Sequence, residues 1–425
     1  MTTTTVAPVP RLRGVVRVPG DKSASHRALL TGALADGPSR VIGLSPGEDV
    51  RATRLIVAQL GAICRDDGDD LVVTGPSGGL RPAPRELECA NSGTTMRLVA
   101  GVLSAIEGQH VLVGDASLSL RPMDRVAVPL RSMGATVEGH GPRITAPLRI
   151  TGGSLRGVTY DVPVASAQVK SAILFAGLAA SGITVVHEPL RTRTTTEDML
   201  ARAGVAIESV EMGDGRRVTL HPGRPRPVDW SIPGDPSQAA FFAVLGLIHR
   251  DAEIEVASID VAPERIGFVH VLRRMGAELT LTPGVNGASL RAVRSTLRAT
   301  SISSHEIPSV DEVPALTVAA AAAEGVTTFR AMGELRVKES DRLAGAVALA
   351  GALGARAWSD GDDFFVDGLG DAGQFASFTH AATLDHRMVM AAAVAGFAGH
   401  GCLIEGSDTV ATSFPGFFDA LARLT

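Results

Sequence analysis

Apolar residues recur along the chain in a repeated pattern: a helical apolar stretch, a glycine, and then a short alternating segment. The pattern returns about every 70 residues, which is typical of a protein built from repeats. Glycine directly after a helix usually adopts the left-handed conformation that ends it. The alternation that follows, as in Ala135-Thr-Val-Glu, is typical of a strand. The five copies are centred on Gly61, Gly134, Gly204, Gly276 and Gly354.

Two Pro/Gly-rich segments divide the series of repeats. Residues 417–424 form a sixth helical stretch with no strand after it, so six α/β units fill the chain. The segments near residue 20 and at 221–236 favour extended connections over helix. A chain of 425 residues is too long for one hydrophobic core, so two domains are expected. Ligand sites often lie between domains, and the sequence therefore predicts a site in the cleft between the two. With crossovers near 20 and 235, one domain spans 21–235 and the other combines 1–20 with 236–425.

Composition excludes several classes of protein. A net charge of −5 and an aromatic content of 4% argue against nucleic-acid binding. Cys64, Cys89 and Cys402 are too far apart for a metal motif or a disulfide framework, which fits a reducing cytoplasm. The sequence therefore predicts a cytoplasmic protein without a metal.

Neither a signal peptide nor a membrane span is expected. The longest apolar stretches, 317–323 and 388–399, are too short to cross a bilayer and are interpreted as buried helices. The Thr- and Pro-rich residues 1–10 lack the apolar region of a signal peptide. They are predicted to form a disordered tail.

Lysine is rare in this chain. Of 40 basic residues only Lys22, Lys170 and Lys338 are lysines, and each stands in a dense polar segment. A lysine ammonium is compact, with three rotatable donors, and cannot be replaced by the planar guanidinium of arginine. These three positions are therefore candidates for a specific role, with chance retention as the alternative.

The segment 19–27 places basic and hydroxyl side chains before an apolar run. It contains Lys22, Ser23, Ser25 and Arg27 and is interpreted as a loop that opens a helix. Ser23 or Ser25 is expected to cap that helix, whose free backbone amides would suit an anion. The glycine spacing does not match a nucleotide-binding P-loop.

The segment 91–97 precedes a second apolar helix. Gly93 allows close approach of the backbone, and Thr94 offers a hydroxyl group. A phosphate site and a plain capped helix are both compatible with this segment.

Arginines and carboxylates supply further candidates. Arginine forks bind carboxylates and phosphates in pairs of hydrogen bonds, and paired carboxylates in a cleft can transfer protons. Two salt-bridging acids are the alternative to the catalytic interpretation. The candidates are Arg121, Arg193, Arg342, Arg387 and the acids Asp311, Glu312 and Glu339.

Eight segments in this order resemble the family of 5-enolpyruvylshikimate-3-phosphate synthases. The resemblance covers essentially the whole chain. It implies an α/β fold of two similar domains, each of three βαβαββ units in an inside-out α/β barrel, with the active site in the interdomain cleft. The segments are Pro19–Arg27, Asn91–Arg97, Leu120–Arg125, Ser166–Lys170, Ile232–Pro236, Glu334–Arg342, Asp385–Arg387 and Ala411–Pro415.

The resemblance also implies a reaction and a set of site residues. Phosphoenolpyruvate and shikimate 3-phosphate would react by addition and elimination, in a monomer without metal or other cofactor. Lys22, Asp311 and Glu339 would be catalytic. Shikimate 3-phosphate would contact Lys22, Ser23, Arg27, Ser166, Ala167, Gln168, Arg193, Asp311 and Lys338, and the 21–235 domain would be the shikimate-phosphate side. Phosphoenolpyruvate would contact Lys22, Gly93, Thr94, Arg121, Gln168, Arg342 and Arg387.

Three alternatives remain at this stage. The sister enzyme that acts on UDP-N-acetylglucosamine normally has a loop cysteine near residues 115–125, and no cysteine lies there. A paralogue for another cyclic alcohol, and a barrel that binds an anionic metabolite without catalysis, are the other two. Within the family, Gly93 matches the branch sensitive to glyphosate, whereas Ser-Ala-Gln-Val-Lys at 166–170 matches the tolerant branch.

Overall fold

The chain folds into two compact units, each built from three repeats. The computed structural model describes residues 2–381 and 385–425. One unit is Lys22–Ile232, and the other combines Met1–Asp21 with Pro233–Thr425. These boundaries fall near the predicted crossovers at 20 and 235. Both crossing segments belong to the second unit, where the backbone of Asp21 donates to the carbonyl of Pro233 over 2.7 Å.

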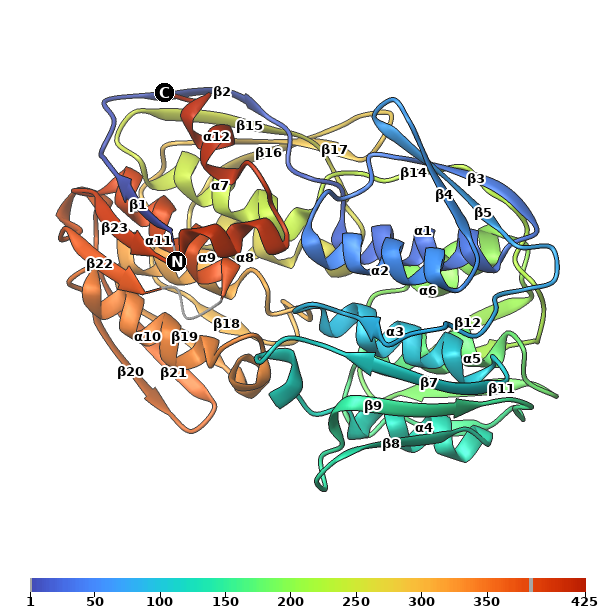
Figure 1. Cartoon of the computed structure of the whole chain (residues 1–425). Helices are drawn as coiled ribbons and strands as arrows, with labels where there is room; N and C mark the ends of the chain where they lie inside the picture. The colour runs from blue at the N-terminus through green and yellow to red at the C-terminus, as the bar shows by residue number, and fades with distance from the viewer. Residues whose placement is uncertain (1, 382–384) are drawn as a thin grey trace. The chain divides into compact units, whose positions relative to one another are not determined.

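The unit Lys22–Ile232 contains three repeats of the order βαβαββ (Figure 1). The first repeat takes its opening strand from the far end of the unit: β14 (Trp230–Ser231), then α1 (Lys22–Leu34), β3 (Gly37–Ile42), α2 (Glu48–Gln59), β4 (Ile63–Asp67) and β5 (Asp70–Gly75). The second is β6 (Leu87–Glu88), α3 (Gly93–Ser104), β7 (Gly108–Val113), α4 (Asp124–Met133), β8 (Thr136–His140) and β9 (Thr145–Gly152). The third is β10 (Thr159–Asp161), α5 (Ala167–Gly177), β11 (Thr184–Glu188), α6 (Thr195–Arg202), β12 (Ile207–Met212) and β13 (Gly215–Leu220).

The second unit repeats the same order twice in full and a third time without its last two strands. Its first repeat is β2 (Leu12–Val16), α7 (Pro236–Ile248), β15 (Ala252–Ile259), α8 (Gly267–Arg274), β16 (Glu278–Pro283) and β17 (Ala288–Val293). The next is β18 (Ser301–Ser303), α9 (Val313–Ala322), β19 (Glu324–Arg330), α10 (Arg342–Ala352), β20 (Arg356–Asp360) and β21 (Asp363–Leu369). The last is β22 (Phe378–Ala381), α11 (His386–Ala398), β23 (Cys402–Glu405) and α12 (Phe417–Ala422), with β1 (Thr3–Val6) in its sheet.

The six sheets of the described residues share one pairing pattern. In each, the first strand of the repeat lies parallel to the second. The second strand also pairs antiparallel with the last strand of the repeat in five sheets and with β1 in the sixth. Five sheets have four strands, as in the order β6-β7-β9-β8, and the sixth has three, β1-β23-β22. This confirms the repeat that the hydrophobic pattern predicted.

The first helix of each repeat is buried, and these six are called the inner helices: α1, α3, α5, α7, α9 and α11. Every residue of α7 and α9 is buried, because both helices are apolar on all sides. The inner helices α7, α9 and α11 contact one another, and α3 contacts α1 and α5. The predicted buried helices at 317–323 and 388–399 are thereby confirmed as parts of α9 and α11.

The repeated glycines end helices as expected. Gly61, Gly134, Gly204, Gly276 and Gly354 all have φ between +79° and +114°, in the left-handed region that favours glycine. In these five repeats the glycine therefore ends the second helix, and the two antiparallel strands that complete the repeat follow directly.

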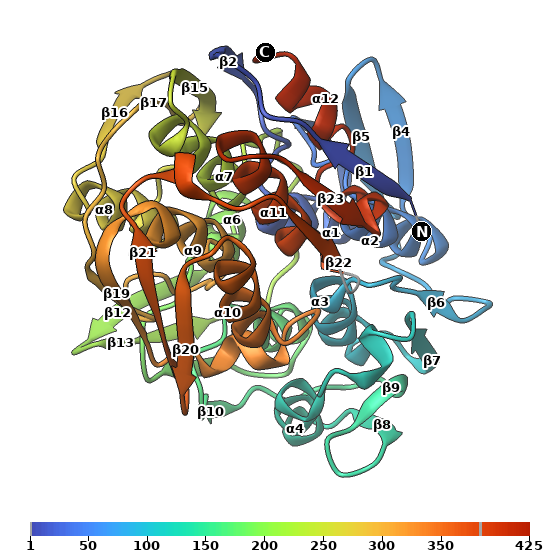
Figure 2. The same cartoon turned by 90° about the vertical axis from the view of Figure 1, so that its left-hand side faces the viewer.

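The prediction of a disordered N-terminal tail was wrong for part of residues 1–10. Thr3–Val6 forms β1, which pairs antiparallel with β23 from Thr3–Glu405 to Val6–Cys402 (Figure 2). The sixth repeat has no closing strand of its own, so β1 satisfies the backbone groups that β23 would otherwise leave at an open edge. Val6 is buried there, and β-branched threonines suit a strand.

Candidate functional site

Five of the six inner helices begin at or next to residues that the sequence singled out. The free backbone N–H groups and the positive end of the dipole at a helix start attract anions. The first residues are Lys22 in α1, Gly93 in α3, Ala167 in α5, Val313 in α9, two positions after Asp311, and His386 in α11, one position before Arg387.

Lys22, Ser23, Arg27 and Arg193 form a first group, which we call the Arg27 cluster. Nη1 of Arg193 donates to Oγ of Ser23 over 2.6 Å, and Nη1 of Arg27 donates to the carbonyl of Ser23 over 3.0 Å. Nζ of Lys22 lies 2.8 Å from Oδ2 of Asp49. The sequence had not suggested Asp49, although it stands in the first turn of α2. Three cationic side chains thus surround one helix start.

Histidine at the same helix start is not a further cation. Burial, followed by the positive charges of Lys22 and Arg27, holds the pKa of His26 well below its usual value. Its Nδ1 lies 2.7 Å from Oγ1 of Thr53, inside the protein. The cationic character of the Arg27 cluster therefore comes from lysine and arginine alone.

The predicted helix cap at this position was wrong. The helix α1 already begins at Lys22, so Ser23 and Ser25 lie inside its first turns. Oγ of Ser25 accepts from the backbone of Ser45 over 3.0 Å, and Ser23 is bound by Arg193. The two serines position neighbouring groups instead of capping the helix.

Gly93, Thr94, Gln168, Arg97 and Arg121 form a second group, the Gln168 cluster. Gln168 donates from Nε2 to Oγ1 of Thr94 over 2.9 Å and accepts at Oε1 from Nη1 of Arg97 over 2.7 Å. A Cβ atom on Gly93 would lie 2.8 Å from Nη1 of Arg97 and 3.4 Å from Nη1 of Arg121. The absence of a side chain at Gly93 is what allows both guanidinium groups to approach the start of α3.

Two further predicted residues stand at the start of α5. Ser166 is the N-cap, where its hydroxyl accepts from the backbone of Val169 over 3.3 Å, and Ala167 is the first helical residue.

Arg121 follows a short 3-10 helix, Leu118–Leu120, and donates to Oδ1 of Asn91 and, over 3.2 Å, to Oγ of Ser117. Arg97 and Asn91 belong to the segment 91–97, but the sequence did not single them out as site residues.

The second unit holds a third group, the Arg342 cluster, of Asp311, Glu339, Arg342, Asp385 and Arg387. Arg342 donates from Nε to Oδ2 of Asp385 over 2.8 Å and from Nη1 to Oδ1 of Asp311 over 2.9 Å. Oε2 of Glu339 lies 2.6 Å from Nη2 of the same guanidinium group. Arg342 therefore binds both of the carboxylates, Asp311 and Glu339, that are predicted to transfer protons.

Charge balance explains how this arginine can be buried. Burial disfavours its charged form, but Asp385, Glu339 and Asp311 outweigh that effect and hold the pKa of Arg342 above its usual value. Asp385 is fully buried, and its other contacts are the hydroxyl of Ser340 and the backbone N–H of Arg387. Asp385, which the sequence placed in the segment 385–387 but did not single out as a site residue, is thus a structural member of the site.

Arg387 differs from Arg342 in having spare donors. Its guanidinium group is buried, and Nη2 lies 3.7 Å from Oδ2 of Asp311. Within residues 2–381 and 385–425, no hydrogen-bond partner reaches its Nε or Nη1. A buried guanidinium with unused donors is a strong indication of an anionic ligand.

The other candidates of this unit separate into two kinds. Nζ of Lys338 reaches the carbonyl of Ser309 over 3.5 Å, close to Asp311 in the chain. Glu312, by contrast, is enclosed and accepts from Ser237 and, over 2.6 Å, from Ser309. Asp311 is about one-fifth exposed and Glu312 is buried, so the first fits a reactive carboxylate and the second a structural one.

Lys170, the third lysine, lies away from any exposed surface. Its side chain is fully buried, with Nζ 2.7 Å from Oε2 of Glu188 and 2.6 Å from Oε1 of Glu197. This setting is that of a closed ion-pair group.

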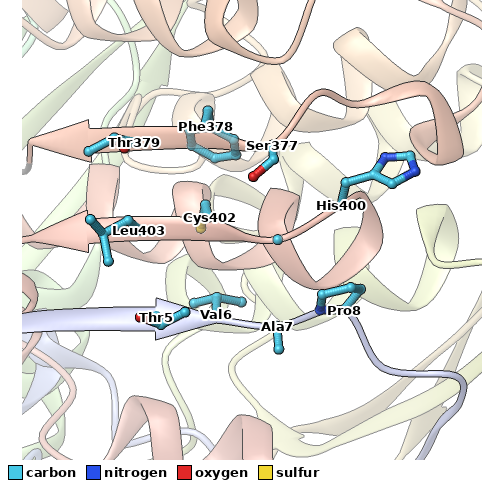
Figure 3. Close-up of a pocket in the computed structure, with 11 residues that line it drawn as sticks. Thr5, Val6, Ala7, Pro8, Ser377, Phe378, Thr379, His400, Cys402 and Leu403 are labelled. Atoms are coloured by element: carbon cyan, nitrogen blue, oxygen red, sulfur yellow. The ribbon is translucent and has the colours of Figure 1, made fainter.

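Other kinds of site find no support in the described residues. They contain no group of three or more His, Cys, Asp or Glu side chains that could hold a metal ion. A pocket on the sheet of the sixth repeat is lined by the end of β1 and by parts of β22 and β23 (Figure 3), and none of the candidate residues lines it. In the part of the chain covered by the structure, helices lack the length and apolar character needed to traverse a bilayer.

Comparisons with known proteins match the chain over nearly its whole length. Residues 6–421 match the family model of EPSP synthase (3-phosphoshikimate 1-carboxyvinyltransferase). The 3-phosphoshikimate 1-carboxyvinyltransferase of Anaeromyxobacter sp. (strain K) is 43% identical over 97% of this chain and 94% of its own. That of Bacillus cereus (strain 03BB102) is 38% identical over 99% of both chains.

Solved structures give the same picture. An EPSP synthase from Acinetobacter baumannii covers 100% of this chain with a TM-score of 0.86 and 37% identity. The enolpyruvyl transferase NikO from Streptomyces tendae, at 20% identity and a TM-score of 0.78, shares the fold.

Proposed function

Since the chain belongs to the EPSP synthase family, we propose that it transfers the enolpyruvyl group of phosphoenolpyruvate to the 5-hydroxyl of shikimate 3-phosphate, with release of phosphate. This step belongs to the biosynthesis of aromatic amino acids. The buried guanidinium group of Arg387, with two unused donors, is the observation that carries the proposal. It requires an anionic partner beside the carboxylates that move protons.

Both substrates are anions, and the candidate residues divide between them. The Arg27 cluster, Ser166, Ala167 and Gln168, together with Asp311 and Lys338, would hold shikimate 3-phosphate. Gly93, Thr94, Arg121, Gln168, Arg342 and Arg387 would hold phosphoenolpyruvate, and Lys22 and Gln168 would contact both substrates. Seven of the nine residues proposed for shikimate 3-phosphate belong to the unit Lys22–Ile232, which supports our proposal that this unit is the shikimate-phosphate side.

The chemistry moves protons during both addition and elimination. In the addition, Asp311 takes the proton of the 5-hydroxyl as its oxygen attacks the central carbon of phosphoenolpyruvate, and Glu339 gives a proton to the methylene carbon. In the elimination, Glu339 takes one proton back from the methyl group of the tetrahedral intermediate, the double bond reforms, and phosphate leaves with the proton that Asp311 had taken. Fixed cations nearby stabilise the negative charge that gathers on carboxylate and phosphate oxygens.

The remaining parts of the proposal concern setting and partners. We assign the enzyme to the cytoplasm as a monomer that needs no metal or cofactor. The three cysteines are free in the structure, which agrees with a reducing compartment.

Phosphate release is the test. Purified protein with both substrates should release phosphate in a chelator-containing buffer, whereas UDP-N-acetylglucosamine in place of shikimate 3-phosphate should give none. Release with the nucleotide sugar alone would assign the chain to the sister activity. No release with either acceptor, despite binding of shikimate 3-phosphate, would favour a non-catalytic binding protein.

A further inference from the structure

Lys170 occupies a closed polar pocket that the proposed reaction does not use. Its ammonium group donates to Oε2 of Glu188 over 2.7 Å and to the backbone carbonyl of Arg193 over 3.1 Å. Its third close neighbour is Oε1 of Glu197 at 2.6 Å, an ion pair without the alignment of a hydrogen bond. Three oxygens from three segments converge on one ammonium, an arrangement that suits lysine better than the larger planar arginine.

The loop between β11 and α6 is held by this pocket. Thr192 donates its hydroxyl to Oε1 of Glu188, and Nη1 of Arg216 donates to the carbonyl of Thr192 over 2.9 Å. With the bond from Lys170 to the next carbonyl, two consecutive backbone groups of the loop are fixed from inside the protein. The side chain that leaves the loop at this point is that of Arg193.

The residues next to these partners bind the other guanidinium group of the Arg27 cluster. Arg27 donates from Nη2 to Oγ of Ser171 over 2.6 Å and from Nε to Oγ1 of Thr196 over 2.5 Å. Oγ of Ser171 and Oγ1 of Thr196 are themselves 2.6 Å apart. Two adjacent pairs thus join α5 to α6: Lys170 with Glu197, and Ser171 with Thr196.

The buried ion-pair group of Lys170, Glu188 and Glu197 is not explained by a contribution to folding stability alone. Burying an ammonium and two carboxylates costs solvation free energy that their attraction only partly returns, and apolar residues often serve as well. Burial raises the pKa of Glu197 even though Lys170 opposes that shift, which shows how far from water the group lies. What apolar residues could not supply is a directed bond to the Arg193 carbonyl.

We propose that Lys170 is a positioning residue: it fixes the loop of Arg193 so that Arg193 and Arg27 meet the phosphate group of shikimate 3-phosphate. This inference rests on the proposed function, because it takes shikimate 3-phosphate as the ligand of the Arg27 cluster. It also explains why a chain with 40 basic residues and only three lysines keeps one inside its core.

The test measures binding of shikimate 3-phosphate by calorimetry in the full chain. Lys170→Met keeps much of the side-chain volume but removes the ammonium. We expect its Kd for shikimate 3-phosphate to rise about 10-fold to 100-fold, since a displacement of about 1 Å at a binding group has effects of this size. The KM for phosphoenolpyruvate should change less than about 3-fold. Lys170→Arg keeps the positive charge but not the shape of the side chain, so we expect its Kd to rise about as much as that of Lys170→Met.

A double-mutant cycle separates positioning from general destabilisation. In an Arg193→Ala background, Lys170→Met should weaken binding much less than it does in the native protein, because both changes remove the same contact. Ile150→Ala, in a buried apolar site of another repeat, is the control that lowers Tm without altering the Kd. Thr192→Val removes one hydroxyl donor from the pocket and serves if Lys170→Met does not fold.

Each outcome decides one question. An unchanged Kd in folded Lys170→Met or Thr192→Val, or fully additive effects in the cycle, would overturn the positioning role. A native protein that does not bind shikimate 3-phosphate would instead contradict the proposed function.

Discussion

At the scale of single residues, the rarity of lysine was an informative signal with two different explanations. Lys22 lies at the start of an inner helix beside Asp49, whereas Lys170 lies inside the protein among carboxylates. Composition could single out both positions, but it could not show what each lysine does. Glu188 and Glu197 follow Lys170 by 18 and 27 residues without any motif, so only the fold brings them together.

Lys22→Arg tests whether this site depends on the shape of lysine. The ammonium of Lys22 fits against Oδ2 of Asp49 at 2.8 Å, with a side chain only 15% exposed, and a guanidinium group cannot take the same place. We expect kcat/KM to fall about 100-fold or more, the scale of a lost acid–base or electrostatic group. Steady-state kinetics with both substrates measure this, and near-native turnover would refute it.

Gly93→Ala tests whether the absence of a side chain at the start of α3 is needed for ligand binding. The new methyl group would meet Nη1 of Arg97 at 2.8 Å and Nη1 of Arg121 at 3.4 Å. It would therefore displace Arg121, which is proposed to hold phosphoenolpyruvate, and Arg97, which binds Gln168. We expect the native enzyme to be inhibited by glyphosate in competition with phosphoenolpyruvate. Since one extra methyl is worth about 1–3 kcal/mol in a tight site, the alanine should raise the inhibition constant of this longer ligand about 10-fold or more, beyond any rise in KM.

A matched control is available for this substitution. Gly351 in α10 has no atom within 4 Å of an added Cβ, so Gly351→Ala should leave both constants unchanged. A native enzyme that is insensitive to millimolar glyphosate, or equal changes in both constants on Gly93→Ala, would show that the steric interpretation is wrong.

At the scale of elements, the order of helices and strands was largely predictable and the long-range pairings were not. Helix-ending glycines are local signals, and all five of the predicted ones have positive φ. The pairing of β1 with β23 joins segments about 400 residues apart, and a short threonine-rich strand has no apolar alternation to announce it. Backbone hydrogen bonds to a distant open edge decide that structure.

Deletion of residues 1–7 tests the role of β1 in the sixth sheet. Its loss exposes the edge of β23 and removes the buried side chain of Val6, whose burial contributes about 2 kcal/mol. We expect Tm to fall by about 4–8 °C. Thermal unfolding followed by circular dichroism measures this shift, with Val6→Ala in the full chain as an intermediate case. An unchanged Tm after deletion would mean that the segment contributes as little as a disordered tail.

At the scale of the whole molecule, the proposal draws the ligands of one substrate from both units. Shikimate 3-phosphate should therefore protect backbone amides at the starts of α1 and α5 and also around Asp311, which precedes α9. Hydrogen exchange with mass spectrometry on the native enzyme, with and without the substrate, measures this protection. Protection confined to one unit at saturating substrate would contradict the assignment of Asp311 and Lys338.

In the proposed reaction, protons move to and from the methylene carbon while the enolpyruvyl group is transferred. The most direct measurement is to run the reaction in deuterium oxide and determine the mass of the product. Addition of a deuteron gives a methyl group with one deuterium, and elimination then removes one of its three hydrogens. We expect deuterium in the product methylene group, and Glu339→Gln should lower both the deuterium content and the release of phosphate. Phosphate release with a product free of deuterium would contradict this proton transfer.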